Sequence, residues 1–253
     1  MTQPNTAIWL VRSEALRIGE ELAAHFDAKL FCPWQASNGN QKADFRRSFP
    51  EFERWILVMA TGIAVRYLDG LSQDKKTDPA VVVLDEGCHH AIALLSGHEG
   101  GANELAFAVA NLTGAKPVVT TATESLKPLI VGVGCRKGSS SLQIEAAVLN
   151  ALGDRSISEI RELATIDLKS EEPGILDFCE KHSIPLRWFS QTTIAARPWV
   201  SKASEWVREQ IGVDGVCEPC ALLASTRGKL IVPKLPLNGV AVAVVEDMWG
   251  EGQ

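Results

Sequence analysis

One short segment constrains the fold of this chain more than any other. In residues 95–105, LSGHEGGANEL, an apolar run passes through three glycines and one histidine into a helical pattern. Glycine at 97, 100 and 101 permits a left-handed backbone and the close approach of another molecule. The first N–H groups of such a helix are available to an anion, with His98 beside them. A tight turn with a hydrogen-bonded histidine explains the same residues equally well.

Strand-like runs alternate with helical patterns along residues 6–120, which predicts an α/β domain with a largely parallel sheet flanked by helices. We expect its strands at residues 7–11, 29–32, 55–59, 80–84, 91–95 and 116–119. Ligands on such sheets bind beyond the carboxyl ends of the strands. Three polar loops are therefore expected at the same edge of the sheet: Thr61-Gly62, residues 97–103 and residues 120–123.

The pattern restarts after a short polar link at residues 125–128. We therefore expect one domain at residues 1–124 and a second, smaller α/β domain at residues 129–253. Its strands are expected at residues 129–133, 186–189, 229–232 and 240–245, and its helices after a capping box at Ser140 and Gln143 and at residues 172–181, 204–211 and 217–224.

Charge and composition argue against several classes of protein. The formal net charge is −6 and no long block of lysine or arginine is present, which argues against nucleic-acid binding. No apolar run approaches the ~20 residues of a membrane span, and the first residues lack the features of a signal peptide. We expect a cytoplasmic protein with reduced cysteines. The sequence leaves a homodimer open.

Two motifs leave other chemistries open. Residues 132–138, GVGCRKG, approach a dinucleotide fingerprint, but the third glycine is one residue late and Asp167 is too far along to serve as its acidic residue. A structural turn, or a turn whose N–H groups and Arg136 hold another anion, fits better. Cys217 and Cys220 form a single CxxC pair, whereas a structural zinc site needs four ligands. Burial is favoured over zinc binding or redox chemistry there.

A metal site near the glycine loop is also weighed. Cys88, His89, His90 and His98 offer ligand atoms within a short span, but adjacent histidines point in different directions on most backbones. We expect no resident metal.

Residues 96–105 with TTATE at 120–124 behind them resemble the CbiG family of cobalt-precorrin-5A hydrolases. ATGIAVR at residues 60–66 and the loop from Asp74-Lys75 to Asp78, before a valine strand, extend the match. The second half resembles the family's carboxyl-terminal domain, which stand-alone CobE proteins share, through VGVGCR at 131–136, IDLK at 166–169, Glu172, VCEP at 216–219 and Lys234.

Two departures from the family pattern stand out. Many members carry a middle region between the domains, whereas here Glu124 is followed almost at once by Lys127-Pro128, as in a compact variant. The family's usual aspartate after the threonine run is Glu124 here, which is one methylene longer.

The resemblance implies a step of anaerobic cobalamin synthesis. The ring-A δ-lactone of cobalt-precorrin-5A would be opened by hydrolysis with loss of acetaldehyde, giving cobalt-precorrin-5B. The substrate carries the cobalt, so no cofactor is expected. Such a large flat ring edged with carboxylates would need apolar walls, glycine-lined close approach, helix N-termini and cations.

The hypothesis for the site follows from that chemistry. His98 would be the general base, because imidazole titrates near neutral pH, and Asp78 a second acid or base. N–H groups around Gly100 and Gly101 would stabilise the oxyanion. The other expected substrate-binding residues are Thr61, Gly62, Arg66, Lys75, Gly97, Asn103, Thr120, Thr121, Gly134, Arg136 and Glu218.

Three rival functions remain. They are a non-catalytic tetrapyrrole-binding or delivery protein of the same pathway, a nicotinamide-dependent oxidoreductase and a zinc protein.

Overall fold

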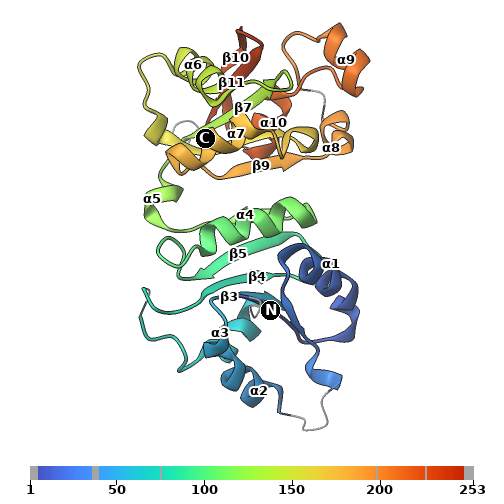
Figure 1. The fold of residues 1–253 in the computed structure, drawn as a ribbon, viewed down its shortest axis with the longest axis vertical. Coiled ribbons are helices and arrows are strands. Elements are labelled where there is room, and N and C mark those ends of the chain that lie inside the picture. The colour runs from blue at the N-terminus through green and yellow to red at the C-terminus, as the bar shows by residue number, and fades with distance from the viewer. Residues whose placement is uncertain (1–4, 36–39, 75, 198, 226, 248–253) are drawn as a thin grey trace. The chain divides into compact units, whose positions relative to one another are not determined.

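The computed structural model describes residues 5–35, 40–74, 76–197, 199–225 and 227–247 (Figure 1), and the fold is that of these residues. The chain divides into two compact units, Met1–Thr121 and Ala122–Gln253. Each unit has its own sheet with helices packed on it, which confirms the predicted pair of α/β domains.

The first unit holds a six-stranded sheet in the order β2-β1-β3-β4-β5-β6. Its strands are β1 (Thr6–Leu10), β2 (Lys29–Phe31), β3 (Arg54–Val58), β4 (Ala80–Leu84), β5 (His90–Leu95) and β6 (Lys116–Val118). Its helices are α1 (Leu16–Phe26), α2 (Gln41–Ser48), α3 (Thr61–Leu68) and α4 (Ala102–Thr113), with short 3-10 turns η1 (Ser13–Ala15), η2 (Pro33–Gln35) and η3 (Phe49–Glu51).

Both faces of this sheet are buried, because alternate residues of each strand point to opposite sides. In β1, Ile8 and Leu10 belong to the core under α1 and α4, whereas Ala7 and Trp9 belong to the core under α2 and α3. Figure 1 shows α4 on one side of the strands and α2 and α3 on the other. Strands β2, β1, β3 and β4 are parallel, which confirms the largely parallel sheet.

The direction of β5 was not foreseen. β5 pairs antiparallel with β4, and β6 pairs parallel with β5. Only residues 85–89 join β4 to β5, a link long enough for a hairpin and too short for a parallel crossover. The Asp85 carboxylate holds this turn by accepting from the N–H groups of His90 at 2.6 Å and His89 at 3.2 Å.

The antiparallel strand corrects one expectation. Thr61-Gly62 follow β3 at one edge of the sheet, whereas residues 97–103 and 120–123 follow β5 and β6 at the opposite edge. The prediction that all three loops lie at one edge was therefore wrong.

The second unit holds a five-stranded sheet in the order β10-β11-β7-β8-β9, in which β7, β8 and β9 are parallel and β11 is antiparallel to both of its neighbours. Its strands are β7 (Leu129–Cys135), β8 (Ile160–Ile166), β9 (Leu186–Phe189), β10 (Lys229–Leu237) and β11 (Val240–Glu246). Its helices are α5 (Ala122–Ser125), α6 (Ser141–Leu152), α7 (Pro173–His182), α8 (Gln191–Ala195), α9 (Glu205–Ile211) and α10 (Cys217–Ala224), with 3-10 turns η4 (Ile157–Glu159) and η5 (Asp167–Lys169).

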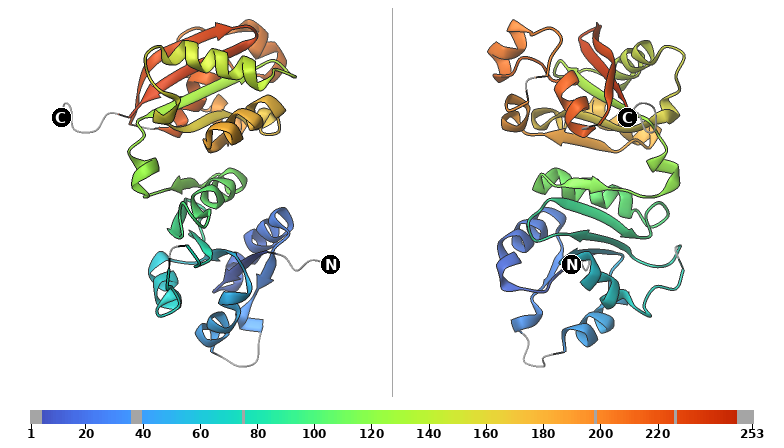
Figure 2. Two further views of the ribbon diagram at one scale, coloured as in Figure 1. Left: turned by 60° about the vertical axis from the view of Figure 1, so that its left-hand side comes forward. Right: turned by 180° about the vertical axis from the view of Figure 1, so that it is seen from behind.

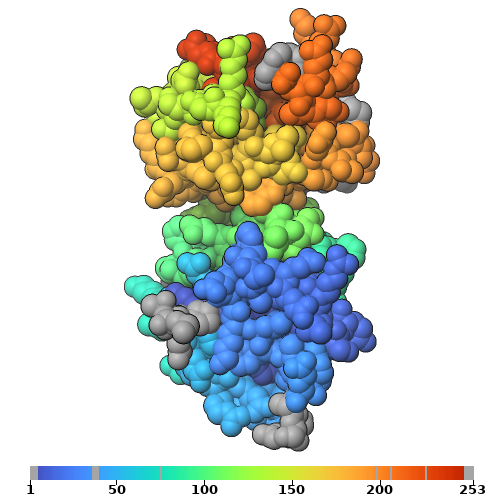
Figure 3. Space-filling model, turned by 45° about the vertical axis from the view of Figure 1, so that its right-hand side comes forward, coloured from blue at the N-terminus to red at the C-terminus, as the bar shows by residue number. Residues whose placement is uncertain are grey.

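Helices also cover both faces of the second sheet. The apolar side chains of α6 and α7 form one core with β7, β8 and β11, and those of α10 form another on the opposite face. Figure 2 shows α6 lying across the sheet, and Figure 3 shows α6 and α7 side by side at the surface. The predicted capping box of Ser140 and Gln143 begins α6, whereas β8 had not been predicted.

Candidate active site

The glycine loop, residues 96–101, folds back on itself between β5 and α4. The carbonyl of Ser96 accepts from the N–H groups of Gly100 at 3.1 Å and Ala102 at 3.2 Å, and the carbonyl of Gly97 accepts from Asn103 N–H at 2.9 Å. The loop therefore uses N–H groups at the start of α4 itself. An oxyanion role for Gly100 would require its bond to Ser96 to break when substrate binds.

Each glycine of the loop lies where a larger residue would clash with a neighbour or strain the backbone. A Cβ at Gly97 would lie 2.7 Å from the methyl carbon of Thr121 and 2.8 Å from the side-chain oxygen of Asn103. A Cβ at Gly100 would lie 2.5 Å from the Cβ of Ser96, and Gly101 has a φ of +83°. Any side chain at the first two positions would push the loop away from its neighbours.

Asn103 ties the loop to the segment after β6. Its Nδ2 donates to Oγ1 of Thr121 at 2.9 Å, and its side chain is buried. Because β5 and β6 are parallel, the loops that follow them meet at the same edge. The structure thus brings Asn103 and Thr121 into direct contact, and the neighbouring Thr120 is exposed. Their role in binding substrate stays a prediction.

His98 lies on the glycine loop with an exposed side chain. It is thus carried by a segment whose ends are fixed by the carbonyls of Ser96 and Gly97. An exposed imidazole at a sheet edge can meet a large substrate without any rearrangement of the core.

Asp78 precedes β4 and, because β4 and β5 are antiparallel, it lies at the same edge as the glycine loop. Its carboxylate accepts from the Ser72 hydroxyl at 2.7 Å and from Gln73 N–H at 2.9 and 3.0 Å. Burial acts to raise the pKa of Asp78, but these hydrogen bonds, with that from Asp74 N–H, outweigh it and lower the pKa below its ordinary value. Its oxygens anchor the loop, which favours a positioning role over proton donation at neutral pH.

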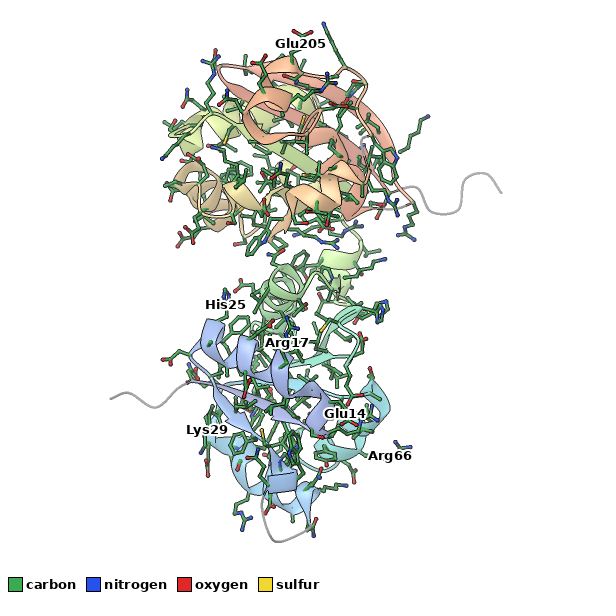
Figure 4. The ribbon with its side chains drawn as sticks, turned by 90° about the vertical axis from the view of Figure 1, so that its right-hand side faces the viewer. Glu14, Arg17, His25, Lys29, Arg66 and Glu205 are labelled. Atoms are coloured by element: carbon green, nitrogen blue, oxygen red, sulfur yellow. The ribbon has the colours of Figure 1, made fainter. Side chains whose placement is uncertain are left out.

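The other expected cations and glycines of the first unit lie elsewhere. Thr61 and Gly62 begin α3 at the opposite edge, and the Arg66 guanidinium donates to the Gly62 carbonyl at 3.0 Å. Figure 4 shows Arg66 at the surface of this unit. Lys75 lies outside the described residues. Arg66 is therefore separated from His98 by the length of the strands.

In the second unit, the turn after β7 already holds an internal anion. The Glu172 carboxylate accepts from Gly138 N–H at 2.6 Å and from the Lys169 ammonium at 2.6 Å. Burial acts to raise the pKa of Glu172, but the bonds from Lys169 and Gly138 lower it below its ordinary value. Arg136 stays exposed at this turn. The anion that Gly138 N–H binds is thus the protein's own Glu172. The alternative that this turn and Arg136 hold another anion stays a prediction.

The glycines at 132 and 134, which resemble part of a dinucleotide fingerprint, have a packing role instead. A Cβ at Gly132 would overlap the carbonyl oxygen of Cys217 and lie 2.7 Å from its carbonyl carbon, and a Cβ at Gly134 would lie 3.3 Å from that of Val216. These two glycines let α10 pack directly on β7. Close helix packing occupies the space in which a nucleotide would need to approach the main chain.

Glu218 and the cysteines of α10 are buried. Glu218 is 1% exposed, and its carboxylate accepts from Ser201 N–H at 2.8 Å, from the Ser201 hydroxyl at 2.5 Å and from Lys234 N–H at 2.9 Å. These bonds join α10 to β10 and to the loop between α8 and α9. Burial raises the pKa of Cys217 to about 12 and that of Cys220 well above its usual value, which suppresses the thiolate form that redox chemistry needs.

The described residues also bear on two further classes of protein, those that hold a metal ion and those that span a membrane. Among the described residues, no group of three or more His, Cys, Asp or Glu side chains is placed to hold a metal ion. None of their helices has the length and apolar character that crossing a bilayer requires.

Ser96 is a notable residue that the sequence patterns missed. It has a left-handed backbone, with a φ of +56°, and it is 6% exposed. Its hydroxyl makes no hydrogen bond within the described part of the chain. The signal available in the sequence was its place as the last residue before the GHEGG run.

Comparisons with known proteins cover both units. The family model described as "Cobalamin synthesis G N-terminal" matches residues 43–124, and that described as "Cobalamin synthesis G C-terminus" matches residues 129–245. Cobalt-precorrin-5A hydrolase of Priestia megaterium is 24% identical, over 78% of this chain and 79% of that protein. Probable cobalt-precorrin-5A hydrolase of Methanocaldococcus jannaschii is 28% identical, over 76% of this chain and 85% of that protein.

A third relative has a higher sequence identity over a shorter stretch of the chain. Cobalt-precorrin-5A hydrolase of Salmonella typhimurium is 54% identical over 79 residues, which is 31% of this chain and 22% of that protein. The match to this relative thus covers well under two thirds of the relative's length.

Proposed function

This chain belongs to the CbiG family of cobalamin-synthesis proteins, and we propose on that premise that it acts as a cobalt-precorrin-5A hydrolase. Two relatives that match over most of their length are named cobalt-precorrin-5A hydrolase and probable cobalt-precorrin-5A hydrolase. The reaction would open the ring-A δ-lactone of cobalt-precorrin-5A and release acetaldehyde, giving cobalt-precorrin-5B. A hydrolase of this kind needs a base, a water molecule and a surface that fixes a carboxylate-edged ring.

The single structural observation that supports this chemistry is the edge formed by the glycine loop, Asn103 and Thr121. It presents an exposed imidazole, His98, on a loop fixed at both ends, next to the hydrogen-bonded pair of Asn103 and Thr121. A base held on a short, fixed loop is the arrangement that general base catalysis requires.

In the proposed reaction, the His98 imidazole takes a proton from water as the water oxygen attacks the lactone carbonyl. Opening the ring leaves a carboxylate and an alcohol. Removal of the alcohol proton then forms the carbonyl of acetaldehyde as the carbon–carbon bond to the ring breaks. The electron pair of that bond stays on the ring carbon, which takes up a proton. Asn103 and Thr121 orient the ring, and Asp78 holds the neighbouring loop in place.

Hydrolysis needs no resident cofactor, and the cobalt enters and leaves with the tetrapyrrole, so we propose that the protein carries none of its own. The cytoplasmic location that the sequence predicts stays a prediction. The homodimer, which the sequence leaves open, is also untested. No observation favours the delivery protein over the enzyme.

Incubation of the purified chain with cobalt-precorrin-5A, with acetaldehyde as the readout, tests the proposal. We expect acetaldehyde in step with consumption of the lactone, and the same rate after dialysis against a chelator. His98→Ala should lower kcat by about 10²–10⁴-fold, the usual contribution of a general base. His25→Ala, an exposed histidine of α1 labelled in Figure 4, is the matched control and should leave turnover unchanged.

Two outcomes would contradict different parts of the proposal, the hydrolase activity and the role of His98. A parent chain that binds the ring but releases no acetaldehyde would show a carrier rather than an enzyme. A folded His98→Ala variant with near-parent turnover would show that another group is the base.

A further inference from the structure

Ser96 combines two unfavourable features at the first position of the glycine loop. Its φ of +56° is a conformation that non-glycine residues rarely adopt. Its hydroxyl is buried and makes no hydrogen bond within the described residues, although buried polar groups in folded proteins nearly always have a partner. Both features reduce the stability of the fold.

The backbone of the loop does not explain why a serine stands there. The Ser96 carbonyl accepts from Gly100 and Ala102, and glycine at position 96 would make the same two bonds while adopting the left-handed conformation without strain. The loop already uses glycine at a left-handed position, Gly101. This chain thus has serine at a position where glycine suits the fold better.

The side chain lies inside the turn, immediately before α4. A Cβ built on Gly100 would lie 2.5 Å from the Cβ of Ser96, so the turn at Gly100 covers the serine side chain. α4 has twelve residues, and Ala102, the first of them, donates to the Ser96 carbonyl. The hydroxyl without a partner is therefore buried at the start of the helix that follows the proposed catalytic loop.

We propose that Ser96 is a substrate-binding residue whose hydroxyl donates a hydrogen bond to an anionic oxygen of the bound tetrapyrrole. The inference rests on the proposed function, because it takes the polycarboxylated ring as the ligand. Binding displaces the turn at Gly100 and uncovers the hydroxyl. The hydroxyl then gains the partner it lacks in the free protein, and this difference between the two states is what favours the displaced loop. The same displacement breaks the bond from Gly100 N–H to Ser96, which frees that N–H for the substrate. The bonds from Ala102 N–H to Ser96 and from Asn103 N–H to Gly97 remain and keep the ends of the loop fixed.

Two variants separate the hydroxyl from the backbone. Ser96→Ala removes the hydroxyl and keeps a side chain in the left-handed conformation, whereas Ser96→Gly removes both the hydroxyl and the strain. Ser183→Gly is the matched control, because Ser183 is also left-handed, with a φ of +51°, but is exposed at the end of α7 in the other unit.

The measurements are the melting temperature, the kcat/KM for acetaldehyde release and the affinity for cobalt-precorrin-5A from an absorbance titration. We expect Ser96→Ala and Ser96→Gly to lower both kcat/KM and affinity by about 10- to 100-fold, the effect of losing one hydrogen bond to a charged group. We expect Ser96→Gly to melt at or above the parent temperature, so that the loss of affinity cannot follow from instability. Ser183→Gly should keep parent turnover and affinity.

Parent-like affinity and turnover in both Ser96 variants would overturn the inference. A parent chain that binds the ring without releasing acetaldehyde would overturn the proposed function instead, and the titration would still decide the role of Ser96. Loss of affinity in Ser96→Ala with full affinity in Ser96→Gly would also overturn it, because the hydroxyl is absent from both variants and its removal could not then be the cause of the loss.

Discussion

Gly132 and Gly134 stand two residues apart in β7, and both face α10. The difference between them lies in what an added methyl would meet: main-chain atoms of Cys217 in the first case and the Val216 side chain in the second. A main chain within a helix cannot move aside as a side chain can. The two glycines therefore have unequal importance, although a sequence motif treats them alike.

Gly132→Ala should destabilise the chain by about 3 kcal/mol or more, because overpacking that cannot relax lies at the upper end of its usual range. Gly134→Ala, the matched control on the same strand, should cost about 1 kcal/mol. Urea unfolding followed by tryptophan fluorescence measures both. Equal, small losses would mean that α10 does not pack on β7 as closely as the structure has it.

At the scale of elements, hydrophobic patterns predicted most strands and helices, because burial on one or both faces leaves a period in the sequence. They missed β8, where Arg161 and Glu162 interrupt the apolar run. Glu162 is nonetheless buried and lies 3.8 Å from the Arg187 guanidinium of β9. Charged side chains that are paired inside a unit cannot be told from solvated ones by pattern alone.

Strand direction limited the prediction of the site. The pairing of Asn103 with Thr121 could be foreseen, since both follow consecutive strands of one sheet. The separation of Arg66 from His98 depends on the hairpin between β4 and β5, and the signal was its short length, residues 85–89. The place of Ser96 before the GHEGG run was visible in the sequence, but its φ and the missing hydrogen-bond partner of its hydroxyl were not, because both are properties of the folded loop.

The loop anchored by Asp78 makes a prediction about pH. Because the pKa of Asp78 is lower in the folded state, its contribution to stability is fully present above the unfolded pKa of ~3.9 and is lost as pH falls through the folded pKa. Asp78→Asn should cost about 1–3 kcal/mol at pH 7, the value of hydrogen bonds to a charged group. That difference should begin to shrink as pH falls below about 4, where the carboxyl of the unfolded chain takes up a proton, and should be lost as pH falls through the lower pKa of the folded state.

Urea unfolding of the parent and Asp78→Asn at pH 7 and at about pH 3 measures this change. Asp74→Asn is the matched control, since Asp74 lies in the same loop but is exposed, and it should have a small effect at both values. A cost of Asp78→Asn that stays constant with pH would contradict the anchoring role.

At the scale of the whole molecule, each unit contains complete sheets and complete cores. No strand of the described residues is shared between the two sheets, and the apolar clusters of each unit are formed by its own side chains. In the second unit the first strand, β7, pairs directly with the last, β11. Leu129 pairs with Glu246, and Asp247 N–H donates to the Pro128 carbonyl at 2.8 Å.

Residues 1–121 and 122–253, produced separately, should therefore each fold cooperatively. If each loses no more than about 1 kcal/mol on separation, its melting temperature should lie within about 4–8 °C of the corresponding transition in the full chain. Circular dichroism and thermal melting measure this. A chain cut within α4, into residues 1–107 and 108–253, is the control: it removes β6 and the buried Val109 from the first core, so its first fragment should not melt cooperatively. Separated units that become ordered only when mixed would show that each core needs contacts from the other.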